Sequence, residues 1–466
     1  YAEALVAEIG IRKDEIQQAC TGSGVKTLYI GGGTPSVLPL GVLKRILDAL
    51  KEAGADSGFQ EFTVEVNPED IVDKGEAYVE GLLSLGVNRI SMGIQSFDDG
   101  ILKWMNRRHT ASGAVEAYRI LEDAGVGYIK IGEVCEERTI DLGNGIALDI
   151  DQYRDIWYQT SYLLDRKQSF HGKAAERYQN YKSMPVKPVF GKDFTGKLSQ
   201  YGANPDRREK SGIRAAVIRE KGTNSEREMA YSFWLAGFDV KDVTMTDLIT
   251  GRETLEDVNV IAFCGGFSNS DVLGSAKGWA GAFLYNDKAK EALDRFYARP
   301  DTLSLGVCNG CQLMVELGLV GKVADNNCGK AKMLHNDSHK FESNFVGVTV
   351  QTNRSVLMGS LSGSRLGIWV AHGEGKFQLP GSEDDYNVVL KYSYEGYPAN
   401  PNGSDFCTAG ICTADGRHLA MMPHLERAFF PWQCGFYPAE RKCQDQVTPW
   451  IEAFVNAYNW IQEKIK

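Results

Sequence analysis

The sequence contains no long apolar run. No stretch approaches the roughly 18 consecutive apolar residues of a membrane-spanning helix, so we expect no membrane partner. There is no cationic start followed by an apolar region, which is the pattern of a secretory signal, although the first residue is Tyr1 and not methionine. We therefore expect a cytoplasmic protein.

Cysteine pairs are scarce for a chain with ten cysteines. The cysteines are scattered along 466 residues, and we single out one close pair, Cys308 and Cys311. A four-cysteine zinc site needs a second such pair, so we expect no metal site. Scattered cysteines without a signal segment are typical of a reduced, cytosolic protein. The net charge of −10 disfavours nucleic acid as a partner.

The length predicts two to four domains, and the sequence divides into three segments. Residues 1–130 alternate between periodic and β-rich stretches, which predicts βαβ units with a parallel sheet. The expected helices are Tyr1–Ile11, Leu40–Ala53 and Ala111–Ala124, and the expected strands are Val25–Ile30, Glu61–Val66 and Asn88–Gly93.

The second segment, residues 131–210, contains one amphipathic helix, Asp149–Gln168, and then a linker over Ser183–Asn204. The third segment, residues 211–466, returns to α/β alternation. Its expected strands are Ile213–Arg219, Val258–Phe263, Leu303–Val307, Phe345–Val350, Val388–Tyr392 and Leu419–Met422, and its expected helices are Ser225–Ala236 and Asn309–Leu319.

Cys308 lies where an apolar strand meets a helix, in the run Gly306-Val307-Cys308-Asn309-Gly310-Cys311-Gln312. This pattern predicts a nucleophile elbow, because glycines permit the sharp turn and a helix N-terminus lowers the pKa of a thiol. Two alternatives remain open from these residues. A C-x-x-C at a helix start also occurs in redox proteins, and a buried structural cysteine fits as well.

A cysteine nucleophile needs a base and a group that orients the base. His424 and Glu426 are two residues apart, so in an extended segment they would project to the same side and could form that pair. A surface histidine beside a solvated glutamate is the alternative. Gly265 and Gly266, with the N–H of Asn309, could form an oxyanion hole, although a Gly-Gly pair is more often a tight turn.

Together these motifs resemble the class I glutamine amidotransferases, and their order is similar to that in the C-terminal domain of the phosphoribosylformylglycinamidine synthases. The matching runs are Arg219–Asn224, Cys264–Ser268, Gly278–Ala280, Arg299–Thr302, the elbow, Ala371–Gly375, Tyr397–Ser404 and Met421–Arg427. The resemblance implies a flavodoxin-like α/β domain over residues 211–466, preceded over residues 131–210 by the end of a synthetase region and a linker.

The same resemblance implies roles for individual residues. Cys308 would attack glutamine, His424 would be the general acid and base, and Glu426 would orient His424. Gln312 would join the oxyanion residues in binding substrate. Ammonia would serve a synthetase that uses ATP and magnesium, whose domains and cofactors lie outside this chain. Leu425 departs from the proline often found there, which would loosen the turn.

The first segment resembles the radical S-adenosylmethionine proteins of the oxygen-independent coproporphyrinogen oxidase and heme chaperone type. The resemblance rests on Tyr29–Ser36, Glu65–Pro68, Gly86–Phe97 and Asn106–Thr110. It implies a partial (β/α) barrel with a vestigial S-adenosylmethionine site formed by Gly31, Gly32, Gly33, Glu65, Gln95 and Arg107. The cluster motif of that family would lie before Tyr1, and Cys20 alone cannot hold a [4Fe–4S] cluster.

We therefore expect a glutamine-hydrolysing enzyme that supplies ammonia for formylglycinamidine ribonucleotide synthesis in purine biosynthesis. Its partners would be glutamine and a synthetase chain or domain. The alternatives are a truncated radical S-adenosylmethionine protein or heme chaperone, and a fusion without catalytic activity.

Overall fold

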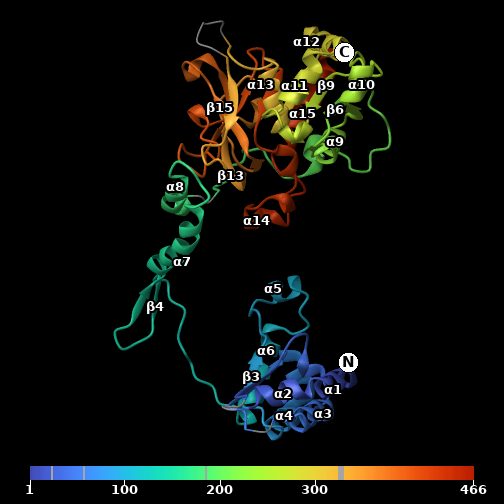
Figure 1. Cartoon of the computed structure of the whole chain (residues 1–466). Coiled ribbons are helices and arrows are strands. Elements are labelled where there is room, and N and C mark those ends of the chain that lie inside the picture. The colour runs from blue at the N-terminus through green and yellow to red at the C-terminus, as the bar shows by residue number, and fades with distance from the viewer. Residues whose placement is uncertain (22–24, 56–57, 184–185, 324–329, 466) are drawn as a thin grey trace. The chain divides into compact units, whose positions relative to one another are not determined.

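The computed structural model describes residues 1–21, 25–55, 58–183, 186–323 and 330–465. The chain divides into two compact units, Tyr1–Glu136 (unit 1) and Glu137–Lys466 (unit 2). Figure 1 shows the elements of both units.

Unit 1 has a three-stranded parallel sheet in the order β1-β2-β3, so the predicted βαβ pattern is confirmed. Apolar side chains of β2 and of the two connecting helices, such as Val64, Leu43 and Val79, form its core. The elements are α1 (Ala2–Ile11), α2 (Lys13–Ala19), β1 (Thr27–Ile30), α3 (Leu40–Glu52), β2 (Glu61–Val66), α4 (Pro68–Ser84), β3 (Arg89–Met92), α5 (Asp99–Trp104) and α6 (Ala111–Asp123).

Unit 2 is built on a nine-stranded sheet, of which five neighbouring strands run parallel. In sheet order these are β18 (His418–Met421), β11 (Leu303–Val307), β9 (Val260–Phe263), β6 (Arg214–Arg219) and β8 (Asp239–Thr244). Numbered along the chain, this order reads 5-4-3-1-2, which is the flavodoxin-like order. The predicted α/β fold class of this region is therefore confirmed.

An antiparallel extension continues the sheet beyond β18. Its strands, outward from β18, are β17 (Thr408–Cys412), β16 (Asn387–Tyr392), β13 (Glu342–Val350) and β14 (Arg365–His372). Three two-stranded ribbons accompany the sheet: β7 (Thr223–Asn224) with β10 (Gly265–Gly266), β12 (Lys332–His335) with β15 (Glu374–Gln378), and β4 (Thr139–Asp141) with β5 (Ala147–Asp149).

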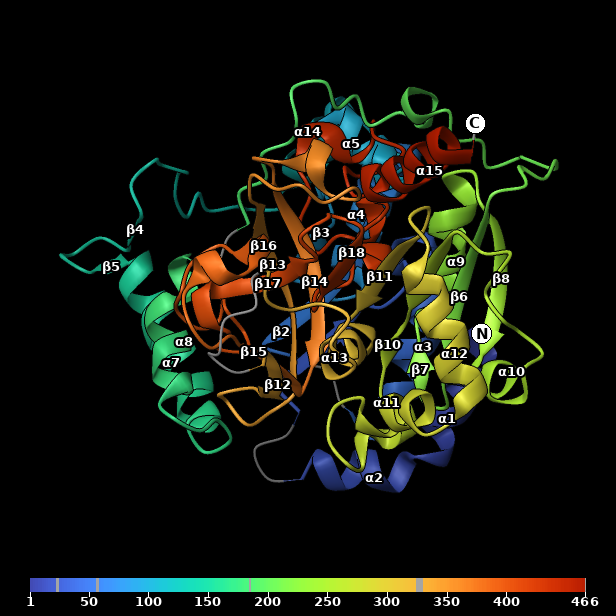
Figure 2. The ribbon, with the colours of Figure 1, turned by 90° about the horizontal axis from the view of Figure 1, so that it is seen from above.

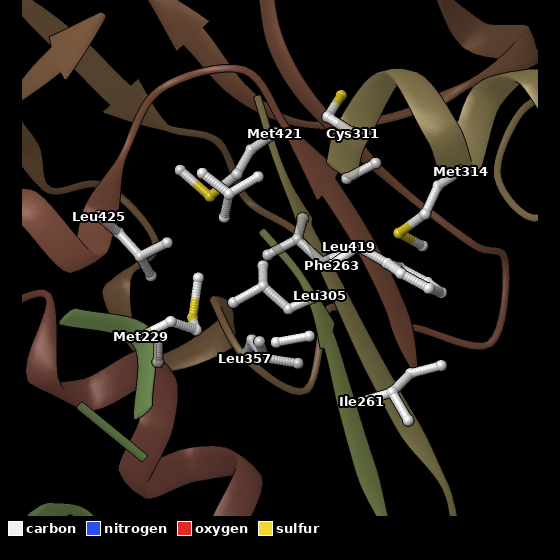
Figure 3. Packing of buried hydrophobic residues seen from close by; sticks show 14 of the residues in the cluster. Met229, Ile261, Phe263, Leu305, Cys311, Met314, Leu357, Leu419, Met421 and Leu425 are labelled. Carbon is white, nitrogen blue, oxygen red and sulfur yellow. The ribbon is translucent and has the colours of Figure 1, made fainter. Parts of the chain in front are cut away.

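Helices cover the parallel strands and bury their apolar side chains. Helix α9 (Glu226–Leu235) packs on β6 and β8 and against α15 (Ile451–Ile465), while α13 (Asn309–Glu316) packs on β9, β11 and β18. The remaining helices of this region are α10 (Met245–Thr250), α11 (Lys277–Leu284), α12 (Asp287–Ala298) and α14 (Ala439–Lys442). Figure 3 shows part of this continuous core, which holds the ends of the strands in place.

Two helices precede the sheet in unit 2 (Figure 2). The predicted amphipathic helix is present as α7 (Ile150–Asp165), and α8 (Lys173–Asn180) follows it. The segment predicted as a linker, of which residues 184–185 lie outside the described ranges, is not free of the sheet. Its Val189 exchanges backbone hydrogen bonds of 2.8 and 2.9 Å with Arg365 at the start of β14.

Candidate active site

Cys308 lies on a strained turn between β11 and α13. Its backbone has φ 53° and ψ −108°, a conformation that a non-glycine residue adopts at a cost and that is typical of a nucleophile elbow. The N–H of Cys308 donates to the carbonyl of Met421 on β18 (2.9 Å). A side chain on Gly310 would collide with the carbonyl of Phe263, so the helix can approach β9 closely only because this residue is glycine.

His424 follows β18 and is held by an isolated bridge to β14, a strand at the far end of the antiparallel extension. Its N–H donates to the carbonyl of Trp369 on β14 (2.9 Å), and its Nδ1 lies 2.6 Å from Oε1 of Glu426. The other ring nitrogen, Nε2, is therefore the one that can serve Cys308, with which the imidazole shares a hydrogen bond.

The predicted geometry of this pair was wrong in one respect. His424 is extended (φ −97°, ψ 95°), but Glu426 lies in a 3-10 turn over Leu425–Arg427 and not in a strand. The turn, and not an alternating strand, returns the carboxylate to the imidazole. Leu425, which departs from the proline often found in the resembled family and was expected to loosen the turn, is fully buried and is the first residue of the turn.

The electrostatics of the pair favour an ion pair. Burial by itself would lower the pKa of His424, but Glu426 and the Cys308 sulfur raise that pKa to about 10. Burial likewise opposes ionisation of Glu426, yet His424 lowers the pKa of its carboxyl. The imidazolium thus lies beside the residue expected to act as the nucleophile.

Gly265 and Gly266 lie directly beside this pair. They form β10, which pairs with β7, and a Cβ built on Gly265 would lie 2.6 Å from Cε1 of His424 and 3.3 Å from Cβ of Cys308. Asn309 is the first residue of α13, so no carbonyl of the helix accepts its N–H. The structure thus brings together the residues that we expected to form an oxyanion hole.

A cavity of about 590 Å³ opens above the thiol. Predicted site residues Gly266, Cys308 and Gln312 line it. The side-chain amide of Gln312 donates to the carbonyl of Glu374 (2.7 Å) and accepts from Asn309 (2.9 Å), so it supports the wall. The other lining residues are Phe267, Ser270, Asp271, His335, His339, Lys340, Phe341, Ala371, His372, Gly373 and Glu374.

Several of these wall residues had no role assigned from the sequence. His372 is one of them: its Nδ1 accepts from Asn402 (2.8 Å), and no partner of its buried Nε2 is found within the described part of the chain. Burial, followed by the nearby His424, lowers the pKa of His372 to about 3, so it is neutral at neutral pH. The run Ala371–Gly375 was noted only as a matching motif, and its spacing carried no information about a cavity.

Cys311 follows Cys308 by three residues in α13 and is fully buried. Burial, together with the charge of Cys308, raises the pKa of the Cys311 thiol well above its ordinary value. Both cysteines are free thiols. A redox pair needs a reactive second thiol, so these observations favour the nucleophile over the redox interpretation of the motif.

In unit 1 a cavity of about 320 Å³ collects most of the residues predicted to form an S-adenosylmethionine site. Gly33, Glu65, Gln95 and Arg107 line it. Gly31 and Gly32 are not among its lining residues, but the N–H of Gly32 donates to Glu65 (3.0 Å). The hydroxyl of Tyr29, followed by this N–H, lowers the pKa of the Glu65 carboxyl.

An iron–sulfur cluster does not fit the residues of unit 1. Residues 1–136 contain two cysteines, Cys20 and Cys135, whereas a [4Fe–4S] cluster of this type needs three thiolates. Within the ranges that the structure describes, no group of three or more His, Cys, Asp or Glu residues is placed to hold a metal ion. The helices in those same ranges are all too short or too polar to cross a bilayer.

Known proteins match both units. A family model described as a CobB/CobQ-like glutamine amidotransferase domain matches residues 212–461, and the radical SAM superfamily model matches residues 12–134. The phosphoribosylformylglycinamidine synthase of Homo sapiens is 38% identical over 385 residues, which cover 73% of this chain and 27% of the relative. A probable phosphoribosylformylglycinamidine synthase of Arabidopsis thaliana is 38% identical over 335 residues, covering 66% of this chain and 23% of the relative.

Among solved structures, PurLQS from Thermotoga maritima is 25% identical and covers 55% of this chain and 99% of that chain, with a TM-score of 0.41. The chain spans about a quarter of the length of the two curated relatives. The amidotransferase match extends over more than half of the 466 residues and contains the elbow, the His424 turn and the oxyanion strand. The chain therefore belongs to the family of CobB/CobQ-like glutamine amidotransferase domains.

Proposed function

We propose that this chain hydrolyses glutamine through a thioester on Cys308 and delivers the ammonia to a synthetase of the phosphoribosylformylglycinamidine synthase type. The observation that carries the proposal is the placement of Cys308, His424 and Glu426 at one end of a parallel sheet, beside a cavity. Ligands of open α/β sheets bind at this carboxyl edge of the strands.

The residues divide the reaction into two steps. The Cys308 thiolate attacks the side-chain amide carbon, and the N–H groups of Gly266 and Asn309 receive the oxyanion. His424 gives its proton to the leaving nitrogen, the C–N bond breaks, and ammonia departs from the thioester. Water then loses a proton to His424 and attacks the thioester carbon. The C–S bond breaks, glutamate leaves and the thiolate is restored.

The exposed apolar side chains of helix α7 are evidence that unit 2 binds a large partner. None of its residues is buried, and Trp157 is 72% exposed. Tyr153, Ile156, Leu163 and Leu164 on the same helix are also exposed. Apolar side chains gathered on one exposed helix mark an interaction site, and a synthetase chain or domain would cover it.

Ammonia release from glutamine tests the proposal. The full chain and Cys308→Ala are compared, together with covalent labelling by 6-diazo-5-oxo-L-norleucine, an electrophilic glutamine analogue. We expect slow hydrolysis by the unmodified chain, because its synthetase partner is absent, and neither hydrolysis nor labelling by the variant. Equal labelling of the two proteins would contradict the assignment of Cys308.

A second candidate activity concerns the cavity of unit 1. We propose that it binds S-adenosylmethionine, because Glu65 and Arg107 present opposite charges to one cavity of about 320 Å³. Calorimetric titration of the full chain with S-adenosylmethionine tests this proposal. Heat that disappears in Glu65→Gln would support it, and absence of heat with the unmodified chain would count against it.

A further inference from the structure

Glu374 lines the cavity above Cys308. It is the first residue of β15 and its side chain is 22% exposed. Oε2 accepts from the N–H of Ser275 (2.9 Å) and from its hydroxyl. Within the described residues, the one recorded contact of Oε1 is Nδ1 of His335 at 3.5 Å, and the His335 side chain is 70% exposed. One oxygen is therefore held and the other is available to a ligand.

The position of Glu374 relative to the nucleophile is set by α13. Gln312 lies one helical turn after Cys308, and its amide donates to the carbonyl of Glu374 (2.7 Å). One turn advances about 5.4 Å along the axis. In glutamine the amide carbon and the α-nitrogen are four bonds apart, which at about 1.5 Å per bond spans roughly 5 Å. An amide placed at Cys308 therefore brings the ammonium group within reach of this wall.

The other carboxylate in the wall, Asp271, is already engaged. Its Oδ1 accepts from the Asn309 amide (3.1 Å) and from the N–H of Ala276 (3.2 Å). Burial, followed by the charge of Glu374, raises the pKa of Asp271. Asp271 thus positions Asn309. Glu374 is then the carboxylate in the wall that can accept a hydrogen bond from a cation in the cavity.

From this arrangement we infer that Glu374 binds the α-ammonium group of the substrate and so selects an α-amino acid amide over a simple amide. The inference rests on the proposed glutaminase function and adds the residue that sets its specificity. A charge-assisted hydrogen bond contributes about 1.5–3 kcal/mol, so its loss corresponds to roughly a 10- to 100-fold change.

The test compares L-glutamine with glutaramate, the same amide without the amino group. We measure kcat and KM for both with the full chain, Glu374→Gln and the control Glu316→Gln, an exposed glutamate at the far end of α13. We expect Glu374→Gln to lower kcat/KM for glutamine about 10- to 100-fold, mainly through KM, and to change glutaramate less than about threefold. The control should match the unmodified chain.

Protection of Cys308 from iodoacetamide provides a readout that needs no turnover. L-glutamate should protect the unmodified chain better than glutarate, and Glu374→Gln should remove that difference. Equal losses with glutamine and glutaramate, or an unchanged preference, would overturn the role of Glu374. Absence of both hydrolysis and Cys308-dependent labelling in the unmodified chain would instead overturn the proposed function itself.

Discussion

Nδ1 of His424 lies 2.6 Å from Oε1 of Glu426, and both side chains are shielded from solvent (1% and 0% exposed). A close, buried contact between an imidazole and a carboxylate fixes the orientation of the ring and leaves Nε2 for Cys308. It also leaves the second oxygen of Glu426 without a recorded partner in the described structure. The ionised state of each side chain is therefore stabilised mainly by the charge of the other.

Replacing the carboxylate tests that dependence. In Glu426→Gln the attraction that raises the pKa of His424 is lost, so the imidazolium and the adjacent thiolate are both destabilised. We expect kcat for glutamine hydrolysis to fall by about 10²- to 10⁴-fold, as with other orienting carboxylates, and KM to change little. Glu316→Gln, at an exposed glutamate in the last turn of α13, is the control. Retention of more than half of kcat would contradict an orienting role.

A methyl group on Gly265 should disable the site without unfolding the protein. In Gly265→Ala the new Cβ would approach His424 and Cys308, so one of them must move away. We expect at least a tenfold loss of kcat with little change in the urea midpoint. Gly321→Ala is the matched control, since among the described residues no atom lies within 4 Å of its added Cβ. Normal kinetics of Gly265→Ala would show that the oxyanion strand lies elsewhere.

Cys311 distinguishes a nucleophile from a redox pair. Its thiol is buried and its pKa is raised, so we expect Cys311→Ala to keep labelling by a glutamine-analogue electrophile, whereas Cys308→Ala loses it. Mass spectrometry of the labelled peptides measures both. Formation of a Cys308–Cys311 disulfide under mild oxidation, with loss of labelling in both variants, would favour the redox interpretation.

Two buried neutral histidines should make unit 2 sensitive to acid. Burial is the main cause that lowers the pKa of His372 to about 3 and that of His418 to about 4. Below the unfolded value of about 6.5 the unfolded chain binds protons that the native state does not, so the free energy of unfolding falls as the pH falls. The free energy of unfolding should fall over the pH range from about 6.5 down to these native pKa values.

Each such histidine contributes a slope of at most about 1.4 kcal/mol per pH unit. Urea unfolding followed by tryptophan fluorescence at pH 7 and pH 5 should therefore show a smaller pH effect in His418→Gln than in the unmodified chain. His339→Gln, at a residue outside the core, should keep the full effect. Identical pH effects in all three proteins would contradict the buried neutral state.

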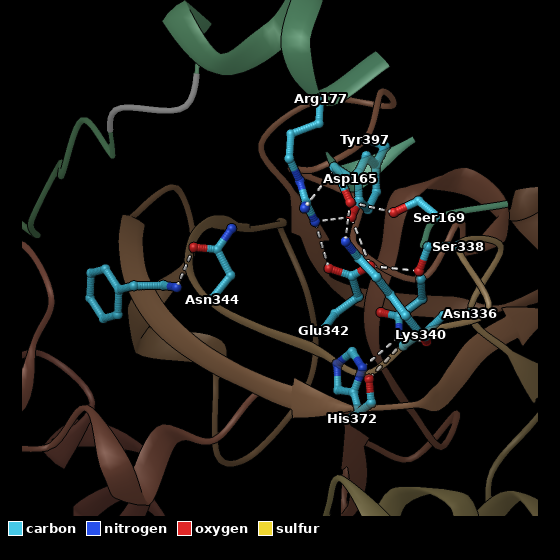
Figure 4. A network of polar contacts seen from close by, with 12 residues as sticks. Asp165, Ser169, Arg177, Asn336, Ser338, Lys340, Glu342, Asn344, His372 and Tyr397 are labelled. Atoms are coloured by element: carbon cyan, nitrogen blue, oxygen red, sulfur yellow. Dashed lines mark hydrogen bonds and ion pairs between the residues drawn. The ribbon is translucent and has the colours of Figure 1, made fainter. Parts of the chain in front are cut away.

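Arg177 anchors the helices α7 and α8 to the sheet (Figure 4). It donates to Asp165 (3.1 Å) and to the buried Glu342 (3.0 Å). Its removal leaves the buried Glu342 without this counter-charge, and burial already disfavours the ionised form of that carboxyl. We expect Arg177→Ala to increase amide hydrogen exchange in α7 and α8. Arg252→Ala, an exposed control, should not. Unchanged exchange would show that the anchor lies elsewhere.

Much of unit 2 followed from local sequence. Strand–helix alternation, with glycines at 306 and 310, predicted the elbow, and the apolar runs predicted four of the five parallel strands to within a few residues; β8 (Asp239–Thr244), whose sequence mixes charged and apolar residues, was not predicted. These features are local because turn chemistry and periodicity act over a few residues. The same is true of β1, β2 and β3 in unit 1. By contrast, the backbone conformation between His424 and Glu426 was mispredicted, because a spacing of two residues does not distinguish a strand from a 3-10 turn.

The sequence by itself determined the type of chemistry: a cysteine at a strand–helix turn, a histidine with a nearby carboxylate, and the amidotransferase motifs that surround them. Only the tertiary structure decided which distant residues share the cavity. Glu374, Asp271 and His372 meet Cys308 because β-sheet pairing brings together segments separated by tens of residues. No local sequence pattern predicts that these residues lie close together, because the register of the sheet and the packing of α13 depend on the whole core.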